Sequence, residues 1–232
     1  MKTEKTVAGI DYTLVRNRGQ RNLRVHLDPG GKPIVSAPYS TSQSEIDDFV
    51  TKSASWIEKH RAKVSDHDYS TGDFVPYLGK KMTLMVIEGK KARYDVIDDK
   101  IIVTTTRKHE VGEIKKTIKN LYFDTIKSKM DVLVPLWCNE LGLKIPEYGV
   151  NRAKGKWGVC YPVEGRLYLS YMCATLSDNL IDMTVLHEVC HLVYSGHGKR
   201  FWGLMKTHMP DLEQRKAELA KVAKSGWSMN IV

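Results

Sequence analysis

The chain has 232 residues, a length that allows one large domain or two small domains, each with its own hydrophobic core. Apolar residues make up 42% of the composition, which is ordinary for a globular protein and excludes a disordered or fibrous chain. The formal net charge is +9, so the surface attracts anions such as nucleotides, nucleic acid or acidic peptides.

The hydropathy pattern and the cysteines bear on location. Residues 1–9 lack the apolar stretch of a signal peptide, and no run approaches the roughly 18 apolar residues that a membrane span requires. We therefore expect a cytoplasmic protein without a membrane partner. The four cysteines have no C-x-x-C spacing, so we expect reduced thiols rather than zinc ligands at Cys138, Cys160, Cys173 and Cys190.

The N-terminal part has the pattern of short strands followed by a helix. Strands are predicted around residues 12–15, 23–27 and 34–35, because β-rich stretches there are separated by turn residues. Ser42 and Glu45 have the spacing of a capping box, and apolar residues at helical spacing continue to about Lys63. We predict a first region over residues 1–70, β-rich with one helix, in an α+β protein whose two parts could also form one integrated domain.

The remaining residues, 71–232, begin with a second β-rich stretch. Strands at 82–87, 92–97 and 101–104 follow one another through short turns, which favours an antiparallel sheet over β-α-β units. A long helix is predicted from about Val111 to Leu141, where Pro135 can kink or split it and Gly142 ends it. Shorter elements complete the chain: strands at 150–152, 156–160 and 166–170, and helices at 178–194, from 199, and at 211–224.

The chemistry is predicted from the sequence His187-Glu188-Val189-Cys190-His191, which is an H-E-x-x-H motif on a predicted helix. Residues four apart lie one turn above each other, so both imidazoles can bind one metal ion. Glu188 then lies beside the site, where it can act as the base that activates water. The surrounding residues are apolar on nearly every side, and burying two histidines and a glutamate without a partner is costly.

A third metal ligand is predicted at His197, just after Ser195 and Gly196, where the glycine can end the helix and reverse the chain. The histidine spacing is that of the metzincins, but Tyr194 occupies their glycine position, so membership of that group does not follow. A downstream carboxylate, Glu213 or Glu218, is the alternative ligand. Zinc is the predicted metal, with manganese or nickel as alternatives.

Several segments in a fixed order resemble one family. They are Lys156 to Cys160, Gly165 to Leu169, Ile181 to Leu192, His197 to Trp202 and Met209 to Asp211, with further similarity at residues 21–27, 37–38 and 55–57. This order resembles the YgjP-like metallopeptidases, predicted metal-dependent hydrolases related to the SprT-like zincins. Residues 66–110 are the least similar, and Val159 replaces a usual serine. The resemblance implies zinc, the three histidines and the catalytic glutamate. We expect an N-terminal antiparallel sheet with helices, followed by a zincin-like helical metal-site region with a small sheet.

The substrate is left open between a peptide and a nucleotide. Arg152, Lys154 and Lys156 alternate on a strand-like segment, so they either form a cationic edge for phosphates or face water. The strand at residues 167–170 is either an edge strand for an extended peptide or, as we favour, an ordinary packed strand. Trp157 and Trp202 are expected to be core anchors rather than substrate platforms.

Three functions are consistent with these residues. A zinc-dependent metallopeptidase is the leading hypothesis, and a nucleoside triphosphate pyrophosphatase acting on substrates such as UTP, an activity also attributed to the family, is the second. The third is a nucleic-acid-associated protein with a structural zinc, which the positive charge permits. Structural zinc sites usually have four ligands rich in cysteine, whereas this chain offers three histidines with an adjacent glutamate. The ligand pattern of this chain therefore disfavours the third hypothesis.

Overall fold

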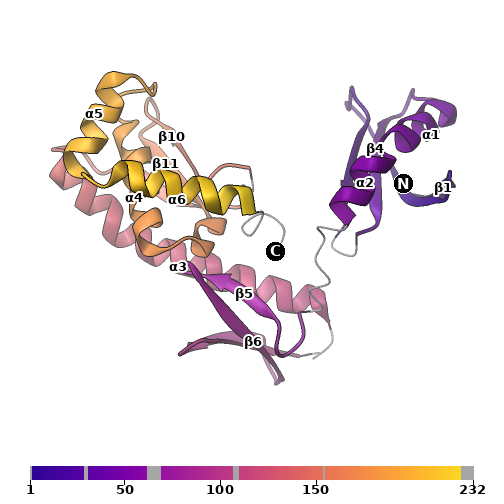
Figure 1. Ribbon diagram of the computed structural model, residues 1–232, viewed down its shortest axis with the longest axis horizontal. Coiled ribbons are helices and arrows are strands. Elements are labelled where there is room, and N and C mark those ends of the chain that lie inside the picture. Colours follow the sequence, from indigo (N-terminus) through magenta and orange to yellow (C-terminus); the bar gives the residue numbers. More distant parts are fainter. Residues whose placement is uncertain (1, 29–30, 62–68, 107–109, 154, 226–232) are drawn as a thin grey trace. The chain divides into compact units, whose positions relative to one another are not determined.

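A computed structural model of the chain describes residues 2–28, 31–61, 69–106, 110–153 and 155–225 (Figure 1). The chain forms two compact units, Met1–His67 and Asp68–Val232. The described residues form six α-helices and three small sheets, which confirms the α+β class. None of these helices is both long and apolar enough to cross a membrane.

The first unit contains a four-stranded sheet in the order β1-β2-β4-β3. Its strands are β1 (Lys2–Val7), β2 (Ile10–Asn17), β3 (Arg24–Leu27) and β4 (Pro33–Pro38). The prediction of a purely antiparallel sheet was wrong in one pairing, because β2 and β4 are parallel. β1–β2 and β3–β4 are antiparallel hairpins, and β4 rather than β3 lies beside β2. When two such hairpins join through the second strand of each, those two strands run parallel.

The helical part of the first unit is α1 (Gln43–Lys52) followed by α2 (Ala54–Arg61). The predicted capping box is confirmed, since Ser42 accepts from the Glu45 N–H and the Glu45 carboxylate accepts from the Ser42 N–H. The single helix predicted to Lys63 is instead broken at Ser53, whose hydroxyl donates to the Phe49 carbonyl at 2.7 Å. The alternating face of the sheet and the helices bury one small core: Tyr12, Leu14, Val35, Ala37, Ile46, Val50 and Ile57.

The second unit begins with a sheet that repeats the topology of the first. It contains β5 (Phe74–Tyr77), β6 (Lys80–Glu88), β7 (Arg93–Ile97) and β8 (Lys100–Thr105) in the order β5-β6-β8-β7. Here too the two hairpins are antiparallel and the central pair, β6 and β8, is parallel. The prediction of a wholly antiparallel sheet therefore fails at the same place and for the same topological reason.

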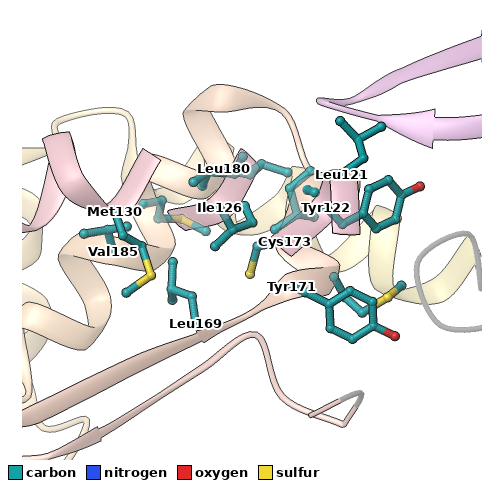
Figure 2. Packing of buried hydrophobic residues seen from close by; sticks show 14 of the residues in the cluster. Leu121, Tyr122, Ile126, Met130, Leu169, Tyr171, Cys173, Leu180 and Val185 are labelled. Atoms are coloured by element: carbon teal, nitrogen blue, oxygen red, sulfur yellow. The ribbon is translucent and has the colours of Figure 1, made fainter. Parts of the chain in front are cut away.

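A helix of 30 residues, α3 (Val111–Glu140), forms the main support of the second unit. It continues through Pro135 without a break and ends before Gly142, which has a positive φ of 65°. Figure 2 shows the α3 side chains of Leu121, Tyr122, Ile126 and Met130 packed against residues from three later elements. These elements are β11 (Arg166–Ser170), the short 3-10 helix η1 (Tyr171–Thr175) and α4 (Asp178–Cys190).

A third sheet lies next to α4 and contains β9 (Glu147–Asn151), β10 (Gly158–Tyr161) and β11 in the order β10-β11-β9. β11 is the central strand, so the strand predicted at 167–170 is not an edge strand, and the packed-strand interpretation holds. The chain then continues into α5 (Lys199–His208) and α6 (Leu212–Ser225). Arg215 of α6 donates to Asp182 of α4 at 2.9 Å, and Trp137 of α3 donates to the same carboxylate at 2.8 Å.

The helix α4 is held at its N-terminus by the β5–β6 hairpin. The Leu78 N–H donates to the Ala174 carbonyl at 2.7 Å, just before α4 begins. A Cβ at Gly79 would lie 2.9 Å from the Cβ of Ser177, the N-cap of α4, so only glycine allows this approach. The hairpin turn therefore fixes the position of the helix that carries His187 and Glu188.

Candidate active site

The last turn of α4 brings the first two predicted ligands together. His187 lies within α4, and His191 is its C-cap, so the helix ends at the second histidine rather than near Tyr194 as predicted. Their Nε2 atoms lie 3.2 Å apart, and both rings are half-buried. The i, i+4 spacing thus produces the expected pair of convergent imidazoles.

The third histidine reaches the same point from the following turn. After His191 the backbone turns back before α5 begins at Lys199, and His197 lies on this turn. Its Nε2 is 3.0 Å from the Nε2 of His187. One ring nitrogen from each histidine lies within 4.8 Å of the other two, and this is the metal-ligand cluster found among the described residues.

The alternative ligands lie elsewhere in the described part of the chain. The carboxylate of Glu213 is within 3.3 Å of the Lys216 ammonium, and Glu218 accepts a hydrogen bond from Ser177. Neither carboxylate belongs to the histidine cluster. The geometry therefore favours His197 over both of them.

The cluster fits a divalent metal in spacing and in protonation. Two nitrogens bound to a tetrahedral zinc at about 2.0–2.1 Å would lie about 3.3 Å apart, close to the observed separations. Burial, together with the neighbouring imidazoles, lowers the pKa of His187 to about 4, so its ring is neutral at physiological pH. The Tyr194 carbonyl can only accept, so the Nδ1 of His191, 3.0 Å away, donates and leaves Nε2 free to bind a metal.

Glu188 is buried beside this cluster and packs against the edge strand β10. Its side chain is 6% exposed, and burial raises its pKa to about 7, although the charge of Lys156 opposes this shift. A Cβ on Gly158 would lie 2.5 Å from the Oε1 atom of Glu188. The absence of a side chain at residue 158 is thus what allows the carboxylate and the strand to lie in contact.

Two aromatic side chains of α5 form a second layer behind the histidines. Phe201 is fully buried, and its ring centroid lies 5.0, 4.7 and 4.8 Å from those of the three histidines, His187, His191 and His197. Trp202 stacks on His197 with centroids 5.6 Å apart and an interplanar angle of 28°. Trp202 is partly buried against the core, as predicted, but it also contacts a candidate ligand.

Two of the three basic residues predicted to bind substrate, Arg152 and Lys156, lie on a loop rather than on a strand. β9 ends at Asn151 and β10 begins at Gly158, and the side chains of Arg152 and Lys156 are exposed. Lys154 lies outside the described residues. Lys156 is close enough to Glu188 to oppose the rise of its pKa, whereas the charge of Arg152 acts on Tyr171.

Three groups that contribute to the site were not predicted from the sequence. Gly158 falls within the segment Lys156 to Cys160 that resembles the family, but nothing local indicates that it packs against a glutamate 30 residues later. The Tyr194 carbonyl is a backbone group, so it leaves no sequence signal. Phe201 follows His197 by four residues, but His197 lies before α5 begins, so helical spacing does not predict their contact.

Three imidazoles converging beside a buried carboxylate define a metal-dependent hydrolase site. Comparison with family models identifies the particular family: the model described as YgjP-like, metallopeptidase domain, matches residues 21–222. The chain belongs to this family, which confirms the resemblance and makes it a metal-dependent hydrolase. A search of curated proteins found no match.

Proposed function

We propose that this protein is a zinc-dependent peptidase in which His187, His191 and His197 bind the metal and Glu188 is the general base. The observation that supports it best is the convergence of three imidazole nitrogens within 4.8 Å beside a carboxylate that is almost completely buried. Three ligands leave one position of a tetrahedral zinc for water or substrate, as in catalytic rather than structural sites.

The residues of this chain have separate roles in the proposed reaction. A bound divalent metal would lower the pKa of water and polarise the scissile carbonyl. Glu188, with a pKa of about 7, can accept the proton of the attacking water and then donate it to the leaving nitrogen. The Tyr194 carbonyl holds the His191 ring in the tautomer that leaves Nε2 available.

The edge strand β10 favours a peptide as the substrate. Within the described residues β10 pairs with β11 on one side, and its other edge has no strand partner. An extended peptide can add to such an edge through backbone hydrogen bonds. Since Gly158 at the start of β10 contacts Glu188, a peptide on this edge would pass beside the proposed base.

The test is hydrolysis of casein by zinc-loaded protein and by the Glu188→Gln variant. We expect the variant to retain zinc and to lose about 10²- to 10⁴-fold in rate, because the amide cannot accept the proton. Glu164→Gln, an exposed glutamate in the β10–β11 turn, is the matched control and should leave the rate unchanged. Undiminished hydrolysis by Glu188→Gln would overturn the role of Glu188.

A nucleoside triphosphate is the second candidate substrate, and Lys156 is the observation that favours it. Its ammonium acts on Glu188 from an exposed loop, so it could bind a phosphate placed at the metal. A panel of nucleoside triphosphates, assayed for pyrophosphate release beside the casein assay, separates the two candidates. Pyrophosphate release that disappears in Lys156→Ala, with no cleavage of casein, would favour the nucleotide.

A further inference from the structure

His197 differs from the other two histidines in how its ring is held. His187 is half-buried within α4, and the His191 ring is held by its hydrogen bond to the Tyr194 carbonyl. His197 is exposed and lies on the turn between α4 and α5, where the backbone alone leaves its ring free to rotate. Its ring nevertheless lies with Nε2 3.0 Å from that of His187, so another contact must orient it.

The contact that orients it is the face of Trp202. The two rings are close to parallel, with centroids 5.6 Å apart and an interplanar angle of 28°. Phe201 meets the same histidine nearly edge-on, at 72° and 4.8 Å. The His187 ring is also tilted by only 31° from the His197 ring, at 4.9 Å, but it belongs to the proposed ligand set. Of the two aromatic residues outside that set, Trp202 is the one whose flat face lies against the His197 ring.

Trp202 is in turn contacted by the C-terminal helix. The ammonium of Lys216 on α6 lies 4.3 Å from the centroid of the Trp202 ring, a cation–π distance. The same ammonium lies 3.3 Å from the Glu213 carboxylate, one turn earlier on α6. This places a series of contacts, Glu213 to Lys216 to Trp202 to His197, between the last helix and the proposed metal site.

We propose that Trp202 is a positioning residue for His197, and that Lys216 keeps the Trp202 ring in the stacked orientation. This inference rests on the proposed role of His197 as a metal ligand. A ring that is already oriented loses less rotational freedom when it binds a metal, so the stack should raise metal affinity. A role as core anchor alone would change the stability of the metal-free protein and leave the affinity unaltered.

The first experiment compares two replacements of Trp202 in the full chain. Phenylalanine keeps a flat face, and leucine keeps an apolar side chain without one. Zinc affinity measured against a chromophoric chelator should fall about tenfold or more in Trp202→Leu, the size usual for an outer-shell partner, and by less in Trp202→Phe. Equal affinity of the leucine variant and the unchanged chain would overturn the proposal.

Folding of the variants is measured separately, by urea unfolding of the metal-free proteins. Cobalt substitution adds a spectroscopic reading, because the visible bands of Co²⁺ report its coordination geometry. We expect the bands of the unchanged chain in Trp202→Phe, and altered bands in Trp202→Leu because the third imidazole is misoriented. Unaltered bands in Trp202→Leu would contradict the positioning role, however much the metal-free protein is destabilised.

The second experiment removes the cation and leaves the tryptophan. Lys216→Met keeps the length of the side chain and should weaken zinc binding about two- to five-fold. Lys206→Met, an exposed lysine of α5, is the matched control and should leave the affinity unchanged. An effect of the same size in both variants would show a general charge effect and overturn the role of Lys216.

These outcomes separate this inference from the proposed function. A chain that binds zinc through His197 but hydrolyses neither casein nor nucleotides contradicts the proposed function alone. A chain that hydrolyses casein, with zinc affinity and cobalt bands insensitive to Trp202→Leu, contradicts this inference alone. An unchanged chain that binds no zinc overturns both.

Discussion

The two four-stranded sheets of this chain have the same strand order and the same strand directions, and each begins with a two-residue hairpin turn. Ala8 and Gly9 form the first turn and Leu78 and Gly79 the second, with positive φ at all four positions. This backbone matches the twist of a hairpin, which explains why a glycine occupies the second position of both turns. The two units therefore share the same local requirement for glycine at the second position of the hairpin turn.

The two turns differ in what their glycines pack against. A Cβ on Gly9 would meet nothing within 4 Å, whereas one on Gly79 would lie 2.9 Å from Ser177 at the start of α4. In the first unit the glycine serves the turn alone. In the second unit it also allows close packing against the helix that carries the proposed catalytic residues, so the same local structure supports a functional site in one of the two units.

The largest expected loss of stability comes from substitutions in the hydrophobic cores of the two units. Ile126 in the second unit and Ile46 in the first are both fully buried. Replacing either by alanine should cost about 2–5 kcal/mol of the stability of its own unit. Urea unfolding combined with zinc titration should show weaker zinc binding in Ile126→Ala, because α3 packs against α4. Loss of zinc binding in Ile46→Ala would contradict the separation of roles between the units.

The two hairpin glycines give the next effect. Gly79→Ala introduces a residue with positive φ and a clash with the Ser177 backbone, so we expect a loss of about 2–4 kcal/mol together with weaker zinc binding. Gly9→Ala introduces the backbone strain alone and should cost about 1–2 kcal/mol. Unfolding midpoints of the two variants test this order, and equal losses would show that the contact with Ser177 contributes nothing.

Removal of the metal should act on one unit. Zinc at about 100 times its Kd stabilises the unit that binds it by about 2.7 kcal/mol, which a chelator removes. Calorimetry with and without chelator should show a lower Tm for the unfolding of the second unit and no change for the first. A shift of both transitions would mean that the metal is not confined to the histidine cluster.

The smallest effect is expected at two arginines that tie elements together. Arg16 donates to the carbonyls of Pro38, Tyr39 and Thr41, and Arg215 joins α6 to Asp182 and Asp211. Methionine at either position should cost roughly 1–2 kcal/mol. Zinc affinity should fall in Arg215→Met alone, because α6 also carries Lys216. A similar fall in Arg16→Met would contradict this.

Much of the fold was predictable because it depends on local patterns. Apolar periodicity predicted α3 over nearly its whole length, and the capping box at Ser42 is confirmed. The breaks were harder to predict. Pro135 does not interrupt α3, whereas Ser53 ends α1, because a helix is continued or ended by the packing and hydrogen bonds around it rather than by propensity alone.

The sequence by itself determined the family and the three histidines that meet in one cluster. The histidines were predictable because the spacing of ligands on a helix and on the turn after it is a local property. The tertiary structure alone decided the surroundings of these residues: Gly158 against Glu188, Phe201 behind three imidazoles, and Lys216 over Trp202. These contacts join different helices, strands and turns of the second unit, and the pattern within one element does not encode which neighbour it meets.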